Sequence, residues 1–189
     1  MSPATYLPIR ELISLIKGPN NAACLQLLED NLDLFNLARG STNNHQAWEG
    51  GYLDHVTEVM NIAVQLYACL DPLRSLPFSL SDALLVTYLH DVEKPWKYEQ
   101  GPDGQLQHRA EVKTKADAQA FRERKLTEYG IVLTSDQLNG LKYVEGELGD
   151  YSSRERVMGP LAAFCHLCDV TSARIWFNYP HHTLPQEGW

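Results

Sequence analysis

A histidine and an aspartate stand side by side at His90-Asp91, where a long apolar stretch of the chain ends. An imidazole nitrogen and a carboxylate oxygen are common ligands of divalent metals, and adjacent residues can offer both to one point in space. Pro95 follows closely, and its ring prevents a helix from continuing. The pair is therefore expected at the end of a helix, with the positive charge of Lys94 just beyond it.

Two apolar helical stripes elsewhere in the chain each carry one ligand type out of place, at His55 and Asp169. Taken alone, each has a simpler explanation, a hydrogen-bonded core histidine or half of a buried ion pair. Together with His90 and Asp91, however, they form a mixed nitrogen and oxygen set. Such a set suits Mn, Fe, Co, Ni or Zn, whereas thiolates would favour closed structural zinc. The joint pattern favours a divalent metal in the core.

Helices are needed to bring these residues together, and apolar residues spaced three or four apart predict them along most of the chain. The clearest period lies in 52–70, where the face of Val59, Ile62 and Leu66 extends back to His55. No segment alternates convincingly as a strand, so the predicted class is all-α, a single compact helical bundle. Helices are expected over about 9–16, 22–39, 52–70, 80–91, 108–129, 135–144 and 156–177.

Local signals also predict where helices begin and where loops lie. Ser79 with Asp82, and Thr134 with Gln137, have the spacing of capping boxes. Residues 41–51 are polar and end in two glycines, which indicates a loop, although His45 is a costly residue for a mere connector. A turn is expected at 101–104, and an irregular tail from 178.

Composition places the chain among ordinary globular proteins, with 44% hydrophobic and 21% charged residues. Its 189 residues fit one domain, 1–189. The net charge of −8 argues against general nucleic-acid or anionic-membrane binding, because both partners need a basic surface. We expect no membrane span, no signal peptide, a cytoplasmic location and four free cysteines.

The order His, His-Asp, Asp resembles the HD-domain superfamily of metal-dependent phosphohydrolases over about residues 45–175. Three segments carry the resemblance: Gly50-Gly51-Tyr52-Leu53-Asp54-His55, then Leu89-His90-Asp91-Val92-Glu93-Lys94, then His166-Leu167-Cys168-Asp169. It implies an all-helical fold in which His55, His90, Asp91 and Asp169 are ligands of one metal.

Some relatives in that superfamily bind a second metal through two further histidines. His108 resembles the first of these, and Glu145 stands where the second would be expected. A glutamate could ligate a metal or act as a base on a water. A solvated histidine at a helix start and a plain surface glutamate are equally good explanations.

The resemblance implies a hydrolase acting on ester bonds, a phosphatase or phosphodiesterase, whose substrate is a nucleotide or a related small phosphoester. Lys94 would supply positive charge to the phosphoryl oxygens, with Arg109 as a secondary candidate. Glu93 would accept a proton, or else pair with a nearby lysine at the surface. His45 is the further candidate for substrate binding.

Two other functions stay open at the level of sequence. HD-type relatives include di-iron oxygenases, for which two irons and oxygen-dependent turnover would be diagnostic. A non-catalytic sensor module that keeps the metal and binds a nucleotide is the other. The sequence leaves the base, the sugar, the number of phosphates and the oligomeric state open.

Overall fold

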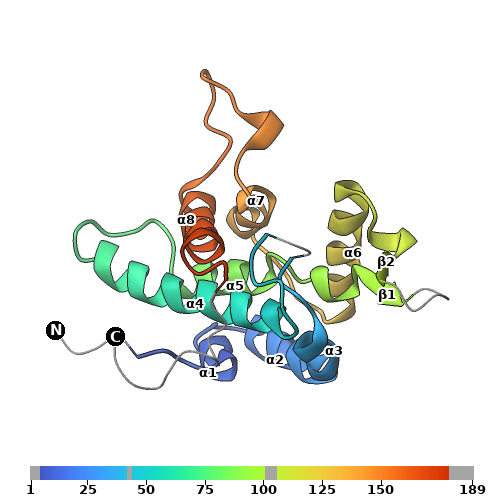
Figure 1. Ribbon diagram of the computed structural model, residues 1–189. Helices are drawn as coiled ribbons and strands as arrows, with labels where there is room; N and C mark the ends of the chain where they lie inside the picture. The colour runs from blue at the N-terminus through green and yellow to red at the C-terminus, as the bar shows by residue number, and fades with distance from the viewer. Residues whose placement is uncertain (1–4, 42–43, 101–105, 179–189) are drawn as a thin grey trace.

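The computed structural model describes residues 5–41, 44–100 and 106–178, and most of its regular structure is helical (Figure 1). The predicted all-α class is therefore confirmed, with one short hairpin added. The elements in chain order are α1 (Ile9–Ser14), α2 (Asn20–Asp30), α3 (Leu32–Leu37), α4 (Gly51–Leu70), α5 (Leu80–Leu89), the 3-10 turn η1 (Lys94–Trp96), β1 (Tyr98–Gln100), β2 (Leu106–His108), η2 (Ala110–Val112), α6 (Lys115–Glu128), α7 (Ser135–Tyr143), η3 (Leu148–Asp150) and α8 (Pro160–Ile175).

Helix α5 lies at the centre of the fold. Its residues from Ala83 to Leu89 are all buried, which is typical of a helix enclosed by protein on every side. It packs against α4, α7 and α8, and α8 packs in turn against α4 and α7. Figure 1 shows α7 and α8 above α4, the helices α1, α2 and α3 below it, and α6 with the hairpin to one side. The carboxyl end of α5 thus points into the interior of the bundle.

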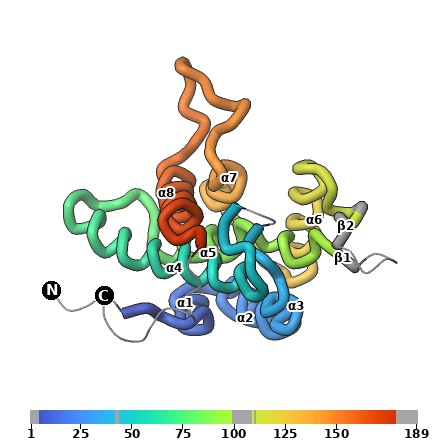
Figure 2. The backbone as a smooth tube through the Cα atoms, in the orientation of Figure 1, coloured from blue at the N-terminus to red at the C-terminus, as the bar shows by residue number. Residues whose placement is uncertain are grey.

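No helix in the described residues has both the length and the apolar character needed to cross a bilayer. The longest, α4, has 20 residues, and it buries only one face. That face includes His55, Val56, Val59, Met60 and Ala63; the predicted face is confirmed at His55 and Val59, whereas Ile62 and Leu66 are only partly buried. The connection between α7 and α8 extends away from the other helices (Figure 2).

Both predicted capping boxes are present. Ser79 and Asp82 exchange hydrogen bonds at the start of α5, and Thr134 and Gln137 do the same at the start of α7. The prediction that a helix begins at His108 is wrong. His108 is the last residue of β2, and α6 begins after Thr114, which forms a third capping box with Asp117.

The expectation that the chain lacks strands is also wrong in detail. β1 pairs with β2 in an antiparallel hairpin, with Tyr98 opposite His108 and Gln100 opposite Leu106. The turn predicted at 101–104 lies outside the described residues. A three-residue strand is too short to show alternation, so periodicity could not reveal this hairpin.

The helix predicted over 22–39 is divided into α2 and α3 at Asn31. Asn31 has φ −122° and ψ 15°, and its Nδ2 donates to the carbonyl oxygen of Leu27 (2.8 Å) and to the hydroxyl of Tyr129 (2.9 Å). The side chain therefore satisfies a carbonyl at the end of α2 and also anchors the break to a distant residue. This contact spans 98 positions, so the local pattern does not contain it.

The last helix is shorter than the predicted 156–177, because α8 begins at Pro160 and ends at Ile175. Proline at the first helical position is favourable, since its missing N–H would have no partner inside the helix. The tail predicted to be irregular lies, from 179 onwards, outside the described residues.

Candidate metal centre

The structure brings the four predicted ligands, His55, His90, Asp91 and Asp169, together inside the bundle. His55 lies near the start of α4, His90 is the C-cap of α5, Asp91 follows it, and Asp169 comes from α8. The first three are almost completely buried. The side chain of Asp169 is 16% exposed, so the cluster opens to solvent on the Asp169 side.

The polar atoms of the cluster face one another. The Nε2 atoms of His55 and His90 are 3.2 Å apart. Asp169 Oδ1 lies 3.1 Å from His55 Nε2 and 3.6 Å from His90 Nε2. Asp91 Oδ2 lies 3.2 Å from His90 Nε2 and 3.5 Å from His55 Nε2. Both imidazoles and both carboxylates therefore converge on one point.

These distances fit the edges of a metal coordination shell. Bonds of about 2.0–2.2 Å from a divalent ion to nitrogen or oxygen place neighbouring ligand atoms roughly 3.0–3.5 Å apart. His55, His90 and Asp169 form a set that could hold a metal ion. Asp91 Oδ2 lies within 3.5 Å of both histidine Nε2 atoms and also contacts the ammonium group of Lys94, so a bound ion would share this oxygen with Lys94. The donor set fits a divalent metal.

The other nitrogen of each histidine is held by a partner. His90 Nδ1 is 2.7 Å from the carbonyl oxygen of Thr87, which can only accept, so Nδ1 carries a proton. His55 Nδ1 is 3.1 Å from Ser172 Oγ. Metal-binding histidines usually donate their second N–H in this way, and the hydrogen bond fixes the ring orientation.

Without a metal, the cluster balances its charge through protonation. Burial lowers the pKa of His55 to about 4, so this ring is neutral. Burial acts in the same direction on His90, but Asp91 and Asp169 outweigh it and raise the pKa of His90 to about 10. Burial would raise the pKa of Asp169, yet hydrogen bonds with both histidines hold it well below the usual range. The two carboxylates thus favour a positive charge at this position, and without a metal the proton on His90 supplies it.

Lys94 adds a second positive charge beside the cluster. Its Nζ makes an ion pair with Asp91 Oδ2, and its side chain is 19% exposed. Burial would lower the pKa of Lys94, but the carboxylates of Asp91 and Asp169 raise it overall. The ammonium group is therefore charged and lies next to a predicted metal ligand.

Glu93 and Arg109 lie on segments that follow the His-Asp pair. The side chain of Glu93 is only 12% exposed, its Oε2 lies 3.8 Å from Arg122 Nε, and burial raises its pKa. Arg122 also donates to the carbonyl oxygen of His90 (2.7 Å), so it links Glu93 to the end of α5. The backbone N–H of Arg109 donates to Lys97 O (3.0 Å), which fastens the end of the hairpin after η1.

His45 lies beside the cluster although it comes from the loop before α4. Its ring centroid is 4.8 Å from that of His55, and its Nδ1 is 2.7 Å from Gln46 Oε1. Burial lowers the pKa of His45, and the positive charge of Lys94 acts in the same direction. The ring is therefore a neutral polar group next to the cluster.

The glycine pair Gly50-Gly51 allows this loop to close against α4. Gly50 is the N-cap of α4 and has φ +79°, a conformation that other residues rarely adopt. A Cβ on Gly51 would overlap the carbonyl oxygen of Gln46. Glycine is thus required at position 50 for its backbone conformation and at position 51 for the close approach of Gln46. Both requirements come from the loop that carries His45.

Three polar residues behind His55 were missed by sequence reasoning, namely Gln46, Glu58 and Ser172. All three are hydrogen-bonded to one another, with Gln46 and Ser172 buried and Glu58 partly buried. The sequence held a partial signal, because Glu58 follows His55 by three positions and Ser172 follows Asp169 by three. That spacing places each on the same helix face as a ligand.

The structure does not bring Glu145 to the cluster. It forms an ion pair with Lys115 (3.2 Å), and both side chains are more than half exposed. The backbone of His108 ends β2, but its side chain lies outside the described part of the structure. The proposed second metal thus gains no ligand from Glu145 in this arrangement.

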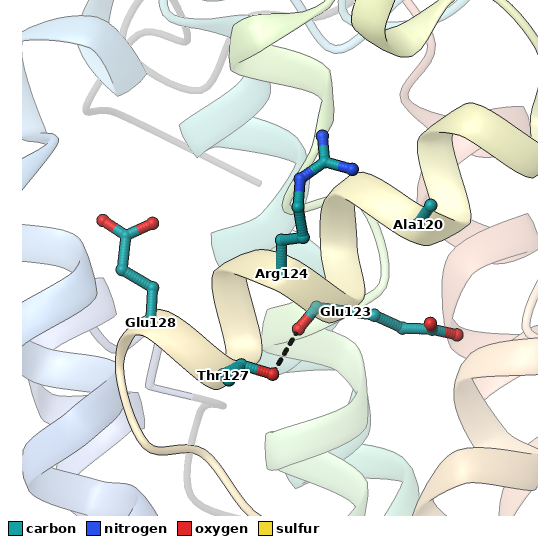
Figure 3. A pocket seen from close by; sticks show the side chains of 5 residues that line it. All are labelled: Ala120, Glu123, Arg124, Thr127 and Glu128. Carbon is teal, nitrogen blue, oxygen red and sulfur yellow. Dashed lines mark hydrogen bonds between the residues drawn. The ribbon is translucent and has the colours of Figure 1, made fainter.

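Two surface hollows are separate from the cluster. One of about 550 Å³ follows a single face of α6, where Arg124 and Glu128 extend to the same side and Glu123 points away from them (Figure 3). Thr127 Oγ1 donates to the carbonyl oxygen of Glu123 (2.9 Å) in this helix. Another of about 540 Å³ lies along the connection between α7 and α8. Neither shares a residue with the four residues of the cluster.

No family model, curated protein or solved structure matches this chain. The assignment of the site therefore depends on its own geometry. The chain contains a buried cluster of imidazole and carboxylate groups that could hold a divalent metal ion, with a lysine and a third histidine beside it.

Proposed function

We propose that this chain is a metal-dependent phosphohydrolase of the HD type that acts on a nucleotide or a related small phosphoester. The observation that supports this most directly is the convergence of His55, His90, Asp91 and Asp169 in the core, with ligand atoms 3.1–3.6 Å apart. The opening beside Asp169 would admit the substrate.

The chemistry that a divalent ion supplies when bound is Lewis acidity, which strengthens water as a nucleophile near neutral pH and withdraws charge from a phosphoryl oxygen. Asp91 and Asp169 would hold such an ion with the two imidazoles. Lys94 is charged and sits beside Asp91, so it is placed to attract and orient a phosphoryl group.

His45 and Glu93 complete the proposed machinery. His45 is neutral and borders the cluster, so it can accept a hydrogen bond from the substrate. Glu93 is buried and burial raises its pKa, so it holds a proton more readily than an exposed carboxylate does, and we assign it the role of proton acceptor. Arg109 is a secondary candidate for contact with the phosphate.

The test combines metal analysis of the purified protein with phosphate release from nucleoside mono-, di- and triphosphates, cyclic nucleotides and a generic phosphodiester. We expect one Mn, Co, Ni, Fe or Zn per chain and metal-dependent phosphate release. His55→Ala and Asp91→Ala should abolish both.

His166→Ala is a suitable control, because His166 lies outside the cluster and hydrogen-bonds to the carbonyl oxygen of Val144 (2.6 Å). The proposal is wrong if the wild-type protein binds no divalent metal, or if the ligand variants hydrolyse the same esters at the wild-type rate. Oxygen-dependent turnover with two irons would indicate an oxygenase instead, and tight nucleotide binding without turnover would indicate a sensor.

A further inference from the structure

A chain of hydrogen bonds runs behind His55, on the side away from the metal cluster. His55 Nδ1 lies 3.1 Å from Ser172 Oγ, and Ser172 Oγ lies 2.5 Å from Glu58 Oε2. Gln46 Nε2 lies 3.2 Å from Ser172 Oγ and 3.3 Å from Glu58 Oε2. His55 and Ser172 are fully buried and Gln46 is 2% exposed, whereas Glu58 is partly buried at the outer end of the chain of hydrogen bonds.

The directions of these bonds can be worked out from Ser172. A serine hydroxyl donates one hydrogen bond and accepts two. The amide nitrogen of Gln46 can only donate, and an ionised Glu58 can only accept. Ser172 must therefore donate to Glu58 and accept from both Gln46 and His55. This arrangement requires the proton of neutral His55 to sit on Nδ1, which leaves Nε2 with a free lone pair.

We infer that Glu58, acting through Ser172, is a positioning residue that holds His55 in the tautomer whose Nε2 can bind a metal ion. The inference rests on the proposed function, since it assigns a role at the same metal centre. Glu58 does not touch the ligand cluster itself. It acts by setting which nitrogen of His55 carries the proton.

The same carboxylate also orients His45 through Gln46. With its Nε2 turned to Glu58 and Ser172, Gln46 presents Oε1 to His45 Nδ1 at 2.7 Å. An amide oxygen accepts, so the proton of neutral His45 must also be on Nδ1. Glu58 thus fixes two histidines, one at the metal and one beside it.

The backbone of Gln46, whose side chain links Glu58 to His45, has an unusual conformation. Its φ is +41°, which is uncommon for a residue other than glycine. Its backbone N–H donates to Phe177 O, and its carbonyl oxygen accepts from the Gly40 N–H, both at 2.9 Å. Such conformations persist only where surrounding contacts maintain them.

The test measures Mn²⁺ and Co²⁺ affinity by titration calorimetry at about pH 8 for wild type, Ser172→Ala, Glu58→Gln and the double variant. At that pH most of Glu58 is ionised, since burial raises its pKa to about 7. We expect each single change to weaken metal binding roughly 10- to 100-fold, as is usual when the partner of a ligating histidine is lost. Because both residues act on His55 in series, the double variant should lose no more than the stronger single variant.

Thr171→Ala is the matched control, since it removes a hydroxyl at the adjacent position of α8 that donates to Leu167 O (2.6 Å) within the same helix. It should bind metal as wild type does. Urea unfolding of the metal-free proteins separates loss of fold from loss of affinity. Long-range proton–nitrogen NMR of the wild-type protein gives a second readout, which needs no variant, and should show the proton of His45 on Nδ1.

Unchanged metal affinity in Ser172→Ala and Glu58→Gln would overturn the inference, as would a His45 proton on Nε2 in the wild-type protein. These outcomes differ from failure of the proposed function. In that case the wild-type protein itself would bind no metal, or would bind it and release no phosphate.

Discussion

Metal binding to this protein should release about one proton per ion. In the metal-free cluster, Asp91 and Asp169 carry two negative charges, and His90 and Lys94 carry two positive charges. The pKa of His90 is raised to about 10 by the two carboxylates, whereas burial lowers the pKa of His55 to about 4. Between these values His90 holds a proton that a bound cation must displace, and His55 holds none.

The magnitude follows from this count. One displaced proton means that the apparent affinity for the metal rises about tenfold per pH unit, or about 1.4 kcal/mol, between roughly pH 8 and pH 9, where Glu58, with a pKa of about 7, is already ionised. Titration calorimetry of chelator-treated protein with Mn²⁺, in buffers of different ionisation enthalpy, measures the number of protons directly. We expect a value near one at about pH 8.

His166→Gln should give the same proton count, because His166 lies outside the cluster. A count near zero at about pH 8 would mean that His90 is neutral before the ion arrives. A count near two would mean that His55 is charged as well. Either result refutes the charge balance derived from the two carboxylates.

Three other changes test separate parts of the site. Lys94→Met should tighten Mn²⁺ binding roughly tenfold, because it removes the positive charge that competes with the metal ion for Asp91. The same change should slow phosphate release. Weaker metal binding in this variant would show that the charge of Lys94 does not oppose the bound ion. Gly51→Ala should destabilise the protein by about 1–3 kcal/mol in urea unfolding, since the new Cβ overlaps Gln46 O, whereas Gly149→Ala, with open space around it, should change little. Burial raises the pKa of Glu58 to about 7, above its value of 4.5 in an unfolded chain, so the folded protein holds this proton more tightly. The stability that protonated Glu58 contributes is complete below about pH 4.5 and is lost as the pH rises through about 7. Metal-free wild type should therefore lose stability relative to Glu58→Gln over that range. Parallel urea midpoints for the two proteins from about pH 5 to pH 8 would contradict this.

The four residues of the cluster could be predicted from sequence because each one interrupts a pattern. His55 and Asp169 stand on faces that are otherwise apolar, and His90-Asp91 ends a buried helix, so their chemistry conflicts with their position. The capping boxes of α5 and α7 were visible for a similar reason, since both partners lie within one turn.

The remaining features depend on contacts between distant residues. Nothing in the local sequence around Ser172 or Glu58 distinguishes either residue from other polar helix residues. Their connection to His55 becomes visible only through the hydrogen bond that forms where α8 packs against α4. The break at Asn31 depends on Tyr129, which no local window includes. The start of α6 was different, because Thr114 and Asp117 carried a usable capping signal that the charged, alanine-rich pattern from His108 obscured.

The hydrogen bond between His55 and Ser172 joins residues 117 positions apart, with most of the chain between them. Closing so long a loop carries an entropic cost, which the packing of α8 against α4 and α5 must offset. The cluster needs α4, α5 and α8 in place before its ligand atoms converge. Uptake of a metal ion by the complete set of four residues would therefore report that α8 has docked.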